Sequence, residues 1–578
     1  MKQLFLLTTS FMLCCYLYAQ PLAGTDGLGR TLIQNKEAGD VKSNRRVGMF
    51  YFLWQGDKGS PTAPVYWDLD EISRNSPEVF EKQNHTKWGG KIGDYYFWGK
   101  PIYGYYKGDD YWVHLRSIQL LTDAGVDFLV IDATNRNTYP VQSDALMRAI
   151  EAVRKQGKNP PKIVYYTNTQ SGATMQEVYD FYYKEGAPYR YPGCWFYLDG
   201  KPLILGVSKE AAGTNYEKFF TIRESQWPTV PQIVDGWPWI SFKRIPEVHY
   251  NHRGEREILN VSVAQHPNPT AGMGGSAFYG NMDNWGRSYR SNSHGNPETD
   301  IAYGYNFQEQ WDYALKEDVP FIFVTGWNEW IAGRWKSHDS NPEHSWFCDQ
   351  ANPEYSRDIE PSLSAGLKDN YYMQLVNNIR RYKGLEKNLP VQNFTIKQMK
   401  DWDKIPVMYT DYTGDTEHRN HPGAQTNPQT VYTNNTGRND FHMMKAAHNA
   451  GNLYFYAETV QDITAPSGDN WMTLWIDADK NAKTGWHGYD YRIVQGNILQ
   501  QYSGGSWQTV NAKQIKYTVE KNKMMITVPR RLLSSLSTPV AFEFKWSDNM
   551  QTPDPLDWYI SGDAAPGGRF NCQYIAGE

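Results

Sequence analysis

The segment FIFVTGWNEW, residues 321–330, decides the fold of the larger part of this chain. Five apolar or β-branched residues predict a buried strand, and a glycine then ends it just ahead of Asn328 and Glu329. Residues 126–132, VDFLVID, have the same form and end in Asp132. A buried strand that ends in polar residues and is followed by a helical pattern is typical of a βα unit in a parallel sheet.

Such units recur from residue 45 to residue 388. We expect strands at 47–54, 126–132, 163–167, 203–207, 220–223, 258–265 and 319–325, and helices at 111–124, 144–156, 307–316 and 369–382. Thr174 and Glu177 have the spacing of a capping box, which predicts a further helix that starts there. Because no Gly-rich dinucleotide turn follows the first strand, the series favours an α/β fold of the (β/α)8 TIM-barrel type over a doubly wound sheet.

The pattern changes near residue 389, and the region 390–578 has alternating short strands separated by Asn, Gly, Thr and Asp. Strands are expected at 452–458, 471–476, 491–494, 524–528 and 540–546. This spacing predicts a C-terminal β-sandwich that folds as a unit of its own.

Charge and composition narrow the class of ligand. The chain has 578 residues and a formal net charge of -5, and near-neutrality at this size excludes a dedicated nucleic-acid binder. Aromatic residues make up 15% of the chain, including 22 Trp and 41 Tyr. Flat rings with polar edges suit the stacking of sugars, although a Tyr-rich barrel or sandwich surface explains the same excess.

The first residues predict export. A lysine and an apolar run over residues 4–18 precede Ala19, so residues 1–20 are interpreted as a signal peptide cleaved after Ala19. Cys14 and Cys15 raise the alternative of a lipid anchor, but neither follows the small residue that lipoprotein processing favours. We therefore expect a secreted, periplasmic or cell-surface protein without an integral membrane span, and a monomer.

Cysteine and histidine give little sign of metal chemistry. Cys194, Cys348 and Cys572 remain after cleavage, far apart and without a C-x-x-C spacing, so a disulfide framework is not expected. The 13 His residues include no H-E-x-x-H pair, and we expect no catalytic metal.

Reacting groups of a TIM barrel lie where its strands end, which makes Glu329 and Asp132 the catalytic candidates. Glu329 stands between Trp327 and Trp330, and partial desolvation there suits a general acid or base. The structural alternatives are an ion pair between Glu329 and an arginine such as Arg334, and a hydrogen bond between Asp132 and Thr134.

Further side chains near the expected strand ends are candidates for substrate contacts. Trp54, Trp327 and Trp330 are expected to stack on sugar, and the polar contacts are expected from Asn135, His266, Asn328 and Arg334. The loop at 348–361 adds Asp349, Glu354, Asp358 and Glu360, which either contact substrate or form ion pairs and a solvated surface.

The motif Gly-Trp-Asn-Glu-Trp at 326–330, ahead of a helix that contains Asp369-Asn370-Tyr371-Tyr372, resembles glycoside hydrolase families 71 and 99, which include endo-α-mannosidases. The resemblance covers about residues 45–384 and implies a functional carboxylate at Glu329. In the endo-α-mannosidases a second Glu follows three positions later, where this chain has Ala332. The second acid must then be Asp132, across the barrel mouth with inversion, or a loop acid with retention.

Residues 470–491, which include NWMTLWIDAD and TGWHGYDY, resemble a family 9 carbohydrate-binding module. The resemblance implies sugar binding between Trp rings and structural calcium, for which Asp477, Asp479 and Asp490 are the candidate ligands. The same aspartates serve equally well as turn residues.

Together these features predict a secreted glycoside hydrolase that cleaves glycosidic bonds in a polysaccharide or complex glycan by carboxylate acid/base catalysis. The alternative is a non-catalytic glycan-binding surface protein on a hydrolase-like barrel, because Ala332 replaces an acid. A sugar transferase is the third hypothesis, and export argues against it because sugar-nucleotide donors are cytoplasmic.

Overall fold

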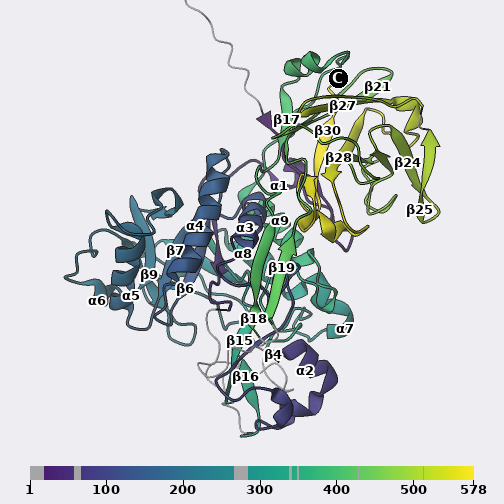
Figure 1. Ribbon diagram of the computed structural model, residues 1–578. Helices are drawn as coiled ribbons and strands as arrows, with labels where there is room; N and C mark the ends of the chain where they lie inside the picture. The colour runs from purple at the N-terminus through teal and green to yellow at the C-terminus, as the bar shows by residue number, and fades with distance from the viewer. Residues whose placement is uncertain are drawn as a thin grey trace, which may run out of the picture.

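The computed structural model describes residues 18–56, 67–265, 284–336, 341–347, 351–426, 429–511 and 513–577. A barrel of parallel strands forms the larger unit, and antiparallel sheets at the C-terminal end of the chain form the smaller one (Figure 1). The predicted fold class, an α/β barrel followed by a β-sandwich, is confirmed. His266, Cys348 and Asp349 lie outside the described residues.

The barrel strands follow one another in chain order, and all neighbours that pair are parallel; β11 and β13 do not pair. They are β3 (Arg46–Tyr51), β6 (Phe128–Ala133), β7 (Lys162–Thr167), β9 (Lys201–Gly206), β10 (Thr221–Gln226), β11 (Gly236–Pro238), β13 (Arg256–Ser262) and β14 (Phe321–Thr325). Strand β14 pairs with β3, so the last strand lies beside the first. Between β11 and β13 the Asn260 side chain donates a hydrogen bond to the Pro238 carbonyl at 2.6 Å, which bridges the remaining gap.

Helices cover the outside of the barrel, and their ends follow from local chemistry. The principal ones are α3 (Tyr111–Ala124), α4 (Pro140–Lys155), α5 (Ser171–Val178), α8 (Tyr305–Glu317) and α9 (Asn370–Lys383). Asp110 caps α3, and Gly125 ends it in the left-handed conformation at φ 82°. No helix in the described parts of the chain is both long enough and apolar enough to cross a lipid bilayer.

The capping box predicted at Thr174 is wrong. Helix α5 begins at Ser171, one turn earlier, and Thr174 lies inside it. The Thr174 hydroxyl donates to the Gln170 carbonyl at 3.1 Å, and the Glu177 carboxylate accepts from the Thr138 hydroxyl at 2.6 Å. Both side chains therefore have partners other than the helix start.

A small mixed sheet stands beside the barrel mouth, with β4 parallel to β5 and the other pairs antiparallel. Its strands are β4 (Trp67–Asp68), β5 (Tyr95–Phe97), β15 (Ile331–Lys336) and β16 (Ser345–Phe347), with α2 (Leu69–Asn75) packed nearby. These elements come from the loops that follow β3 and β14, and they lie together in the lower part of Figure 1. Leu69, Trp88, Tyr96 and Phe347 form their own buried core.

The sandwich has two main sheets. One contains β1 (Tyr18–Ala19), β17 (Val407–Thr410), β20 (Phe441–His448), β21 (Asn452–Thr459), β27 (Lys523–Pro529) and β26 (Lys516–Glu520). The other contains β2 (Ala23–Gly24), β30 (Phe570–Ile575), β28 (Ala541–Asp548), β22 (Thr473–Asp477), β23 (Tyr491–Val494), β24 (Ile498–Ser503), β25 (Ser506–Asn511) and β29 (Asp563–Ala565). Because β2 belongs to one of these sheets, the sandwich also draws on residues far upstream of 390. Strand β1 pairs with β17 but lies within the predicted signal peptide.

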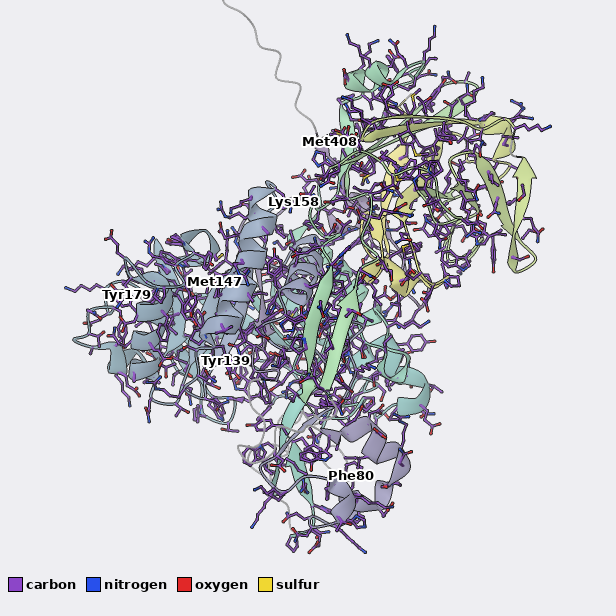
Figure 2. The ribbon with its side chains drawn as sticks, in the orientation of Figure 1. Phe80, Tyr139, Met147, Lys158, Tyr179 and Met408 are labelled. Carbon is purple, nitrogen blue, oxygen red and sulfur yellow. The ribbon has the colours of Figure 1, made fainter. Side chains whose placement is uncertain are left out.

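Buried polar contacts join the sandwich to the barrel. The hairpin of β18 (Arg419–Thr426) and β19 (Gln429–Asn434) extends over the barrel in Figure 1, where Arg419 pairs with Asp110 at 2.7 Å. Beyond the end of α4 the Lys158 ammonium donates to the Thr410 hydroxyl at 2.7 Å; Figure 2 labels Lys158 on the barrel side and Met408 on the sandwich side of this boundary. The two units therefore share a continuous polar interface.

Candidate active site

A cavity of about 470 Å³ opens at the carboxyl ends of the barrel strands, where the active sites of this fold lie. Its volume falls within the range of small-molecule sites. Ten of the sixteen described lining residues are aromatic: Phe50, Phe52, Trp54, Tyr95, Tyr139, Trp227, Trp239, Phe242, Trp335 and Trp346. The polar lining includes Asp132, Thr134, Asn135, Glu329 and Arg357.

The two predicted catalytic carboxylates line the same cavity. Asp132 is the penultimate residue of β6 and Glu329 follows β14, and both strands pair with β3. The expectation that these residues face each other across the mouth is wrong, because barrel closure leaves a single strand between them. Neighbouring strands lie ~4.8 Å apart, so the axes of β6 and β14 are roughly 10 Å apart. The two carboxyl groups therefore project from the same side of the barrel mouth rather than from opposite sides.

Asn328 fixes the chain from which Glu329 projects. Its side-chain oxygen accepts from the Phe52 amide at 2.9 Å, and its side-chain nitrogen donates to the Phe52 carbonyl at 3.1 Å. Asn328 is fully buried, and its two hydrogen bonds hold the ends of β3 and β14 together. It does not contact the cavity, in contrast to its predicted role as a substrate ligand.

Among the described residues, Glu329 pairs with Arg357 rather than with Arg334. Arg357 Nη2 donates to Glu329 Oε2 at 2.6 Å, and the Arg357 side chain is 2% exposed. Backbone hydrogen bonds hold the loop in place, from the Gly326 amide to the Arg357 carbonyl at 3.1 Å and from the Glu360 amide to the Trp327 carbonyl at 3.0 Å. A guanidinium at this distance favours the charged carboxylate. Glu329 is therefore suited to act as a base or nucleophile.

Asp132 has one carboxylate oxygen fixed by its own turn. Oδ1 accepts from the Thr134 amide at 3.0 Å and from the Thr134 hydroxyl at 2.7 Å. Asp132 therefore both makes the predicted hydrogen bond with Thr134 and lines the cavity. This local support orients the carboxyl group at the lip of β6, where Asn135 also lines the cavity.

Successive side chains of β15 point to opposite faces of the strand, which decides whether Ala332 and Arg334 reach the cavity. Gly333 and Trp335 line the cavity, whereas Ala332 and Arg334 point the opposite way. Ala332 is fully buried in the core of the small sheet, and the Arg334 guanidinium lies 4.3 Å above the Trp88 ring. Arg334 is therefore not a substrate contact in this structure. A carboxylate at position 332 would not reach the cavity either.

Trp327 and Trp330 are packing residues rather than stacking platforms. They are 0% and 1% exposed, and neither lines the cavity. The Trp327 ring packs edge-on against Tyr372 at 6.2 Å, and the Trp330 ring against Tyr106 at 5.3 Å. Of the three predicted Trp platforms, Trp54 alone lies at the cavity, with its ring edge-on to Tyr95 at 5.4 Å.

The described acids of the loop at 351–361 are held by neighbouring hydroxyl groups. Glu354 accepts from the Ser288 hydroxyl at 2.5 Å, Asp358 from the Ser356 hydroxyl at 2.9 Å, and Glu360 from the Tyr106 hydroxyl at 2.9 Å. Removal from water raises the pKa of each group, that of Asp358 to about 7. None of the three is among the described lining residues, so their predicted contacts with substrate have no support here.

Arg357 and most of the aromatic lining were not predicted individually. The stretch GWPWISF, residues 236–242, supplies Trp239 and Phe242 and directly follows β10 and its turn. Two Trp residues and a Phe within seven positions at a strand end are a usable signal for a sugar-sized cavity. Arg357 gave no such signal, because its contact with Glu329 depends on how a distant loop folds back.

In the sandwich, Asp477, Asp479 and Asp490 lie close enough to share a cation, with ligand atoms within 4.8 Å of one another. Their oxygens also serve the local turns: Asp477 accepts from the Lys480 amide at 2.7 Å, and Asp490 from the Ala478 amide at 3.0 Å. Burial raises the pKa of Asp477 to about 8. The arrangement thus fits both calcium binding and turn chemistry.

Trp rings of the sandwich contact each other directly. Trp475 stacks on Trp486 with ring centroids 5.1 Å apart. The Trp558 ring lies edge-on to Trp475, and the Trp507 ring is tilted against Trp486. A sugar cannot lie between rings that already touch. Sugar binding by this module would need the outer faces of Trp486 and Trp507, both of which are partly exposed.

Comparison with known proteins gives fold-level similarities only. No protein-family model and no curated protein matches the chain. Among solved structures, a family 99 endo-α-mannosidase from Bacteroides thetaiotaomicron is 13% identical, with a TM-score of 0.32 over 58% of this chain and 97% of that one. A glycoside hydrolase-like protein is 11% identical, with a TM-score of 0.29 over 61% and 98% of the two chains.

Proposed function

We propose that the protein is a glycoside hydrolase that cleaves a polysaccharide or complex glycan at the barrel mouth. The observation that carries this proposal is the cavity of about 470 Å³ in which Glu329 and Asp132 stand among ten aromatic side chains. Aromatic faces stack on the C–H faces of sugar rings, and two carboxyl groups are what hydrolysis of a glycosidic bond requires.

The contacts of the two acids suggest a division of labour. Glu329 is kept charged by Arg357 and would act on the anomeric carbon, directly as a nucleophile or through a water molecule as a base. Asp132 is the other carboxyl group of the cavity and would protonate the leaving oxygen. Trp54 and Trp239 line the space between strand ends and would hold the sugar by stacking.

The setting of this activity is also a proposal. An exported protein would meet glycans at the cell surface, in the periplasm or outside the cell, and the reaction needs no metal. Asp477, Asp479 and Asp490 would bind structural calcium in the sandwich, which would itself contact carbohydrate or support the barrel. We propose a monomeric chain.

A glycan-binding protein without turnover is the second candidate. One observation favours it: the Glu329 charge is already neutralised by Arg357. Such a protein would use the same aromatic cavity but release no product.

A panel of plant, yeast and host glycans distinguishes these functions. Each glycan is incubated with the purified chain, products are read by chromatography, and binding is measured in parallel. Release of shorter sugars supports the hydrolase. Binding without products supports the second candidate, and neither binding nor products from any glycan would contradict both.

A further inference from the structure

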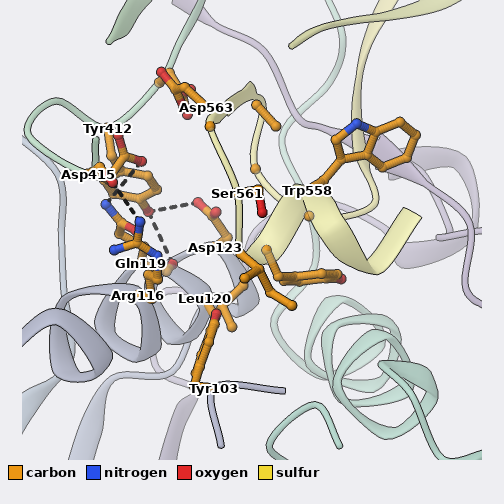
Figure 3. A pocket seen from close by; sticks show the side chains of 17 residues that line it. Tyr103, Arg116, Gln119, Leu120, Asp123, Tyr412, Asp415, Trp558, Ser561 and Asp563 are labelled. Atoms are coloured by element: carbon orange, nitrogen blue, oxygen red, sulfur yellow. Dashed lines mark hydrogen bonds between the residues drawn. The ribbon is translucent and has the colours of Figure 1, made fainter. Parts of the chain in front are cut away.

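A second group of carboxylates lies where the sandwich meets helix α3. Asp411 and Asp415 follow β17, Asp440 directly precedes β20, and Asp563 begins β29. We call these four residues the interface acids. Figure 3 shows Asp415 and Asp563 in the pocket between the two units, with Arg116 and Gln119 of α3 facing them.

Three of the interface acids are close enough to share one ion. Carboxylate oxygens of Asp415, Asp440 and Asp563 all lie within 4.8 Å of one another. Two oxygens bound to the same Ca²⁺ at ~2.3–2.6 Å cannot be more than about 5 Å apart. The observed spacing satisfies this limit without movement of the backbone.

Buried oxygens without hydrogen-bond partners point independently to a missing cation. Asp411 is 5% exposed, and its Oδ2 has no hydrogen-bond partner in the described structure. The same is true of Asp415 Oδ1 and Asp440 Oδ1 within the described residues. Leaving a charged oxygen buried and unpaired is costly, and a cation bound by these oxygens would remove that cost.

Other oxygens of the group already have donors. Asp440 Oδ2 accepts from the Gly414 amide at 2.8 Å, and Asp563 Oδ2 from the Phe441 amide at 2.6 Å. These bonds fix the side chains, so the unpaired oxygens are held in place rather than free to turn toward water. The interface acids therefore have some oxygens fixed by backbone amides and other oxygens without a hydrogen-bond donor.

Nearby basic side chains do not fill this role. Within the described chain, Arg116 donates to the Asp415 carbonyl at 2.7 Å, Lys158 to Thr410, and Lys545 to the Pro566 carbonyl. Their hydrogen bonds thus go to carbonyl or hydroxyl oxygens rather than to the interface carboxylates.

We propose that Asp415, Asp440 and Asp563, with Asp411 beside them, bind a Ca²⁺ ion at the face of the sandwich that meets helix α3. The adjoining cavity of about 50 Å³ has room for an ion and a coordinated water, since one water occupies ~30 Å³ in the liquid. Oxygen ligands of this number and charge suit Ca²⁺ better than a transition metal. This role is structural and independent of glycan hydrolysis.

Calcium binding to the full-length chain tests the proposal. Protein stripped with EDTA is titrated with CaCl2 by calorimetry, and its Tm is recorded with and without the ion. We expect Asp415→Asn to bind one Ca²⁺ fewer per chain, or to bind at least about tenfold more weakly, and to lose the calcium-dependent rise in Tm. Asp462→Asn, which changes the same charge at an exposed site in the sandwich, should match the wild type.

Asp440→Asn provides a second variant in case Asp415→Asn does not fold, because an amide oxygen can still accept from Gly414. The proposal is overturned if wild-type protein binds no Ca²⁺ at millimolar concentration or prefers Mg²⁺. It is also overturned if both Asn variants retain the wild-type number of ions and affinity, since any bound calcium then lies elsewhere, as at Asp477, Asp479 and Asp490.

Discussion

The segment 327–335 has two faces that differ in almost every property. The cavity face presents Glu329, Gly333 and Trp335 to the barrel mouth. The buried face, which includes Trp327, Asn328, Trp330, Ala332 and Arg334, packs into two separate cores or bonds to neighbouring backbone. In the sequence all of these residues are equally good candidates for a functional role. In the structure those on one face line the cavity, and those on the other face hold the segment in place.

This division explains why one acid can be kept while its neighbour is lost. Glu329 projects from a loop that Asn328 fixes, so its position depends on the buried face. Ala332 lies three residues later, in strand β15. Its side chain packs with Tyr96 in the core of the small sheet and does not face the cavity. Substitutions on the buried face should therefore change stability first, and those on the cavity face should change activity first.

Ala332→Glu should give the largest loss of stability. The new carboxylate would enter a fully buried apolar core, and the free energy of unfolding should fall by about 4 kcal/mol or more. Urea unfolding measures this change. The two-face account would be contradicted if Ala332→Glu folds with wild-type stability and gains hydrolytic activity, because position 332 would then reach the cavity.

Trp330→Ala and Trp335→Ala compare the faces with the same substitution. Trp330 is 1% exposed and Trp335 is 37% exposed. We expect Trp330→Ala to lower the free energy of unfolding by about 3–5 kcal/mol, and Trp335→Ala by less than about 1 kcal/mol while it weakens glycan binding. Equal losses of stability would break the comparison, as would normal glycan binding by the Trp335 variant.

A smaller effect concerns the loop that supplies Arg357. Desolvation raises the pKa of Asp358 to about 7, so between about pH 4 and 7 the folded chain holds a proton that the unfolded chain releases. The contribution of Asp358 to stability therefore falls as pH rises through this window. Asp358→Asn should flatten the decline in unfolding free energy between pH 5 and 8, and an unchanged slope would exclude this role.

Much of the barrel could be predicted because its strands are long and apolar. The exceptions have physical causes. Strand β11 is Gly236–Pro238, three residues with glycine and proline at its ends, and gives no periodic signal. The small sheet beside the mouth pairs β5 with β15, more than 200 residues apart, and no local pattern specifies such a pairing.

The site was predictable only as far as strand ends allow. Asp132 and Glu329 follow from their positions after buried strands, and the structure brings both to one cavity. Both residues lie next to β3 because the barrel closes and brings the last strand beside the first. The order of the strands along the sequence does not show this. Arg357 and the packing roles of Trp327 and Trp330 depend on non-local contacts, so residue type alone misassigned them.

Hydrolysis by Glu329→Gln tests the central claim most directly. The rate of product release is measured on whichever glycan the wild type cleaves, alongside glycan binding and Tm, with Glu298→Gln as an exposed control. The account predicts a loss of ~10²–10⁴-fold in rate with binding nearly intact and the control unaffected. More than a tenth of wild-type activity in Glu329→Gln would show that Glu329 is not a catalytic residue.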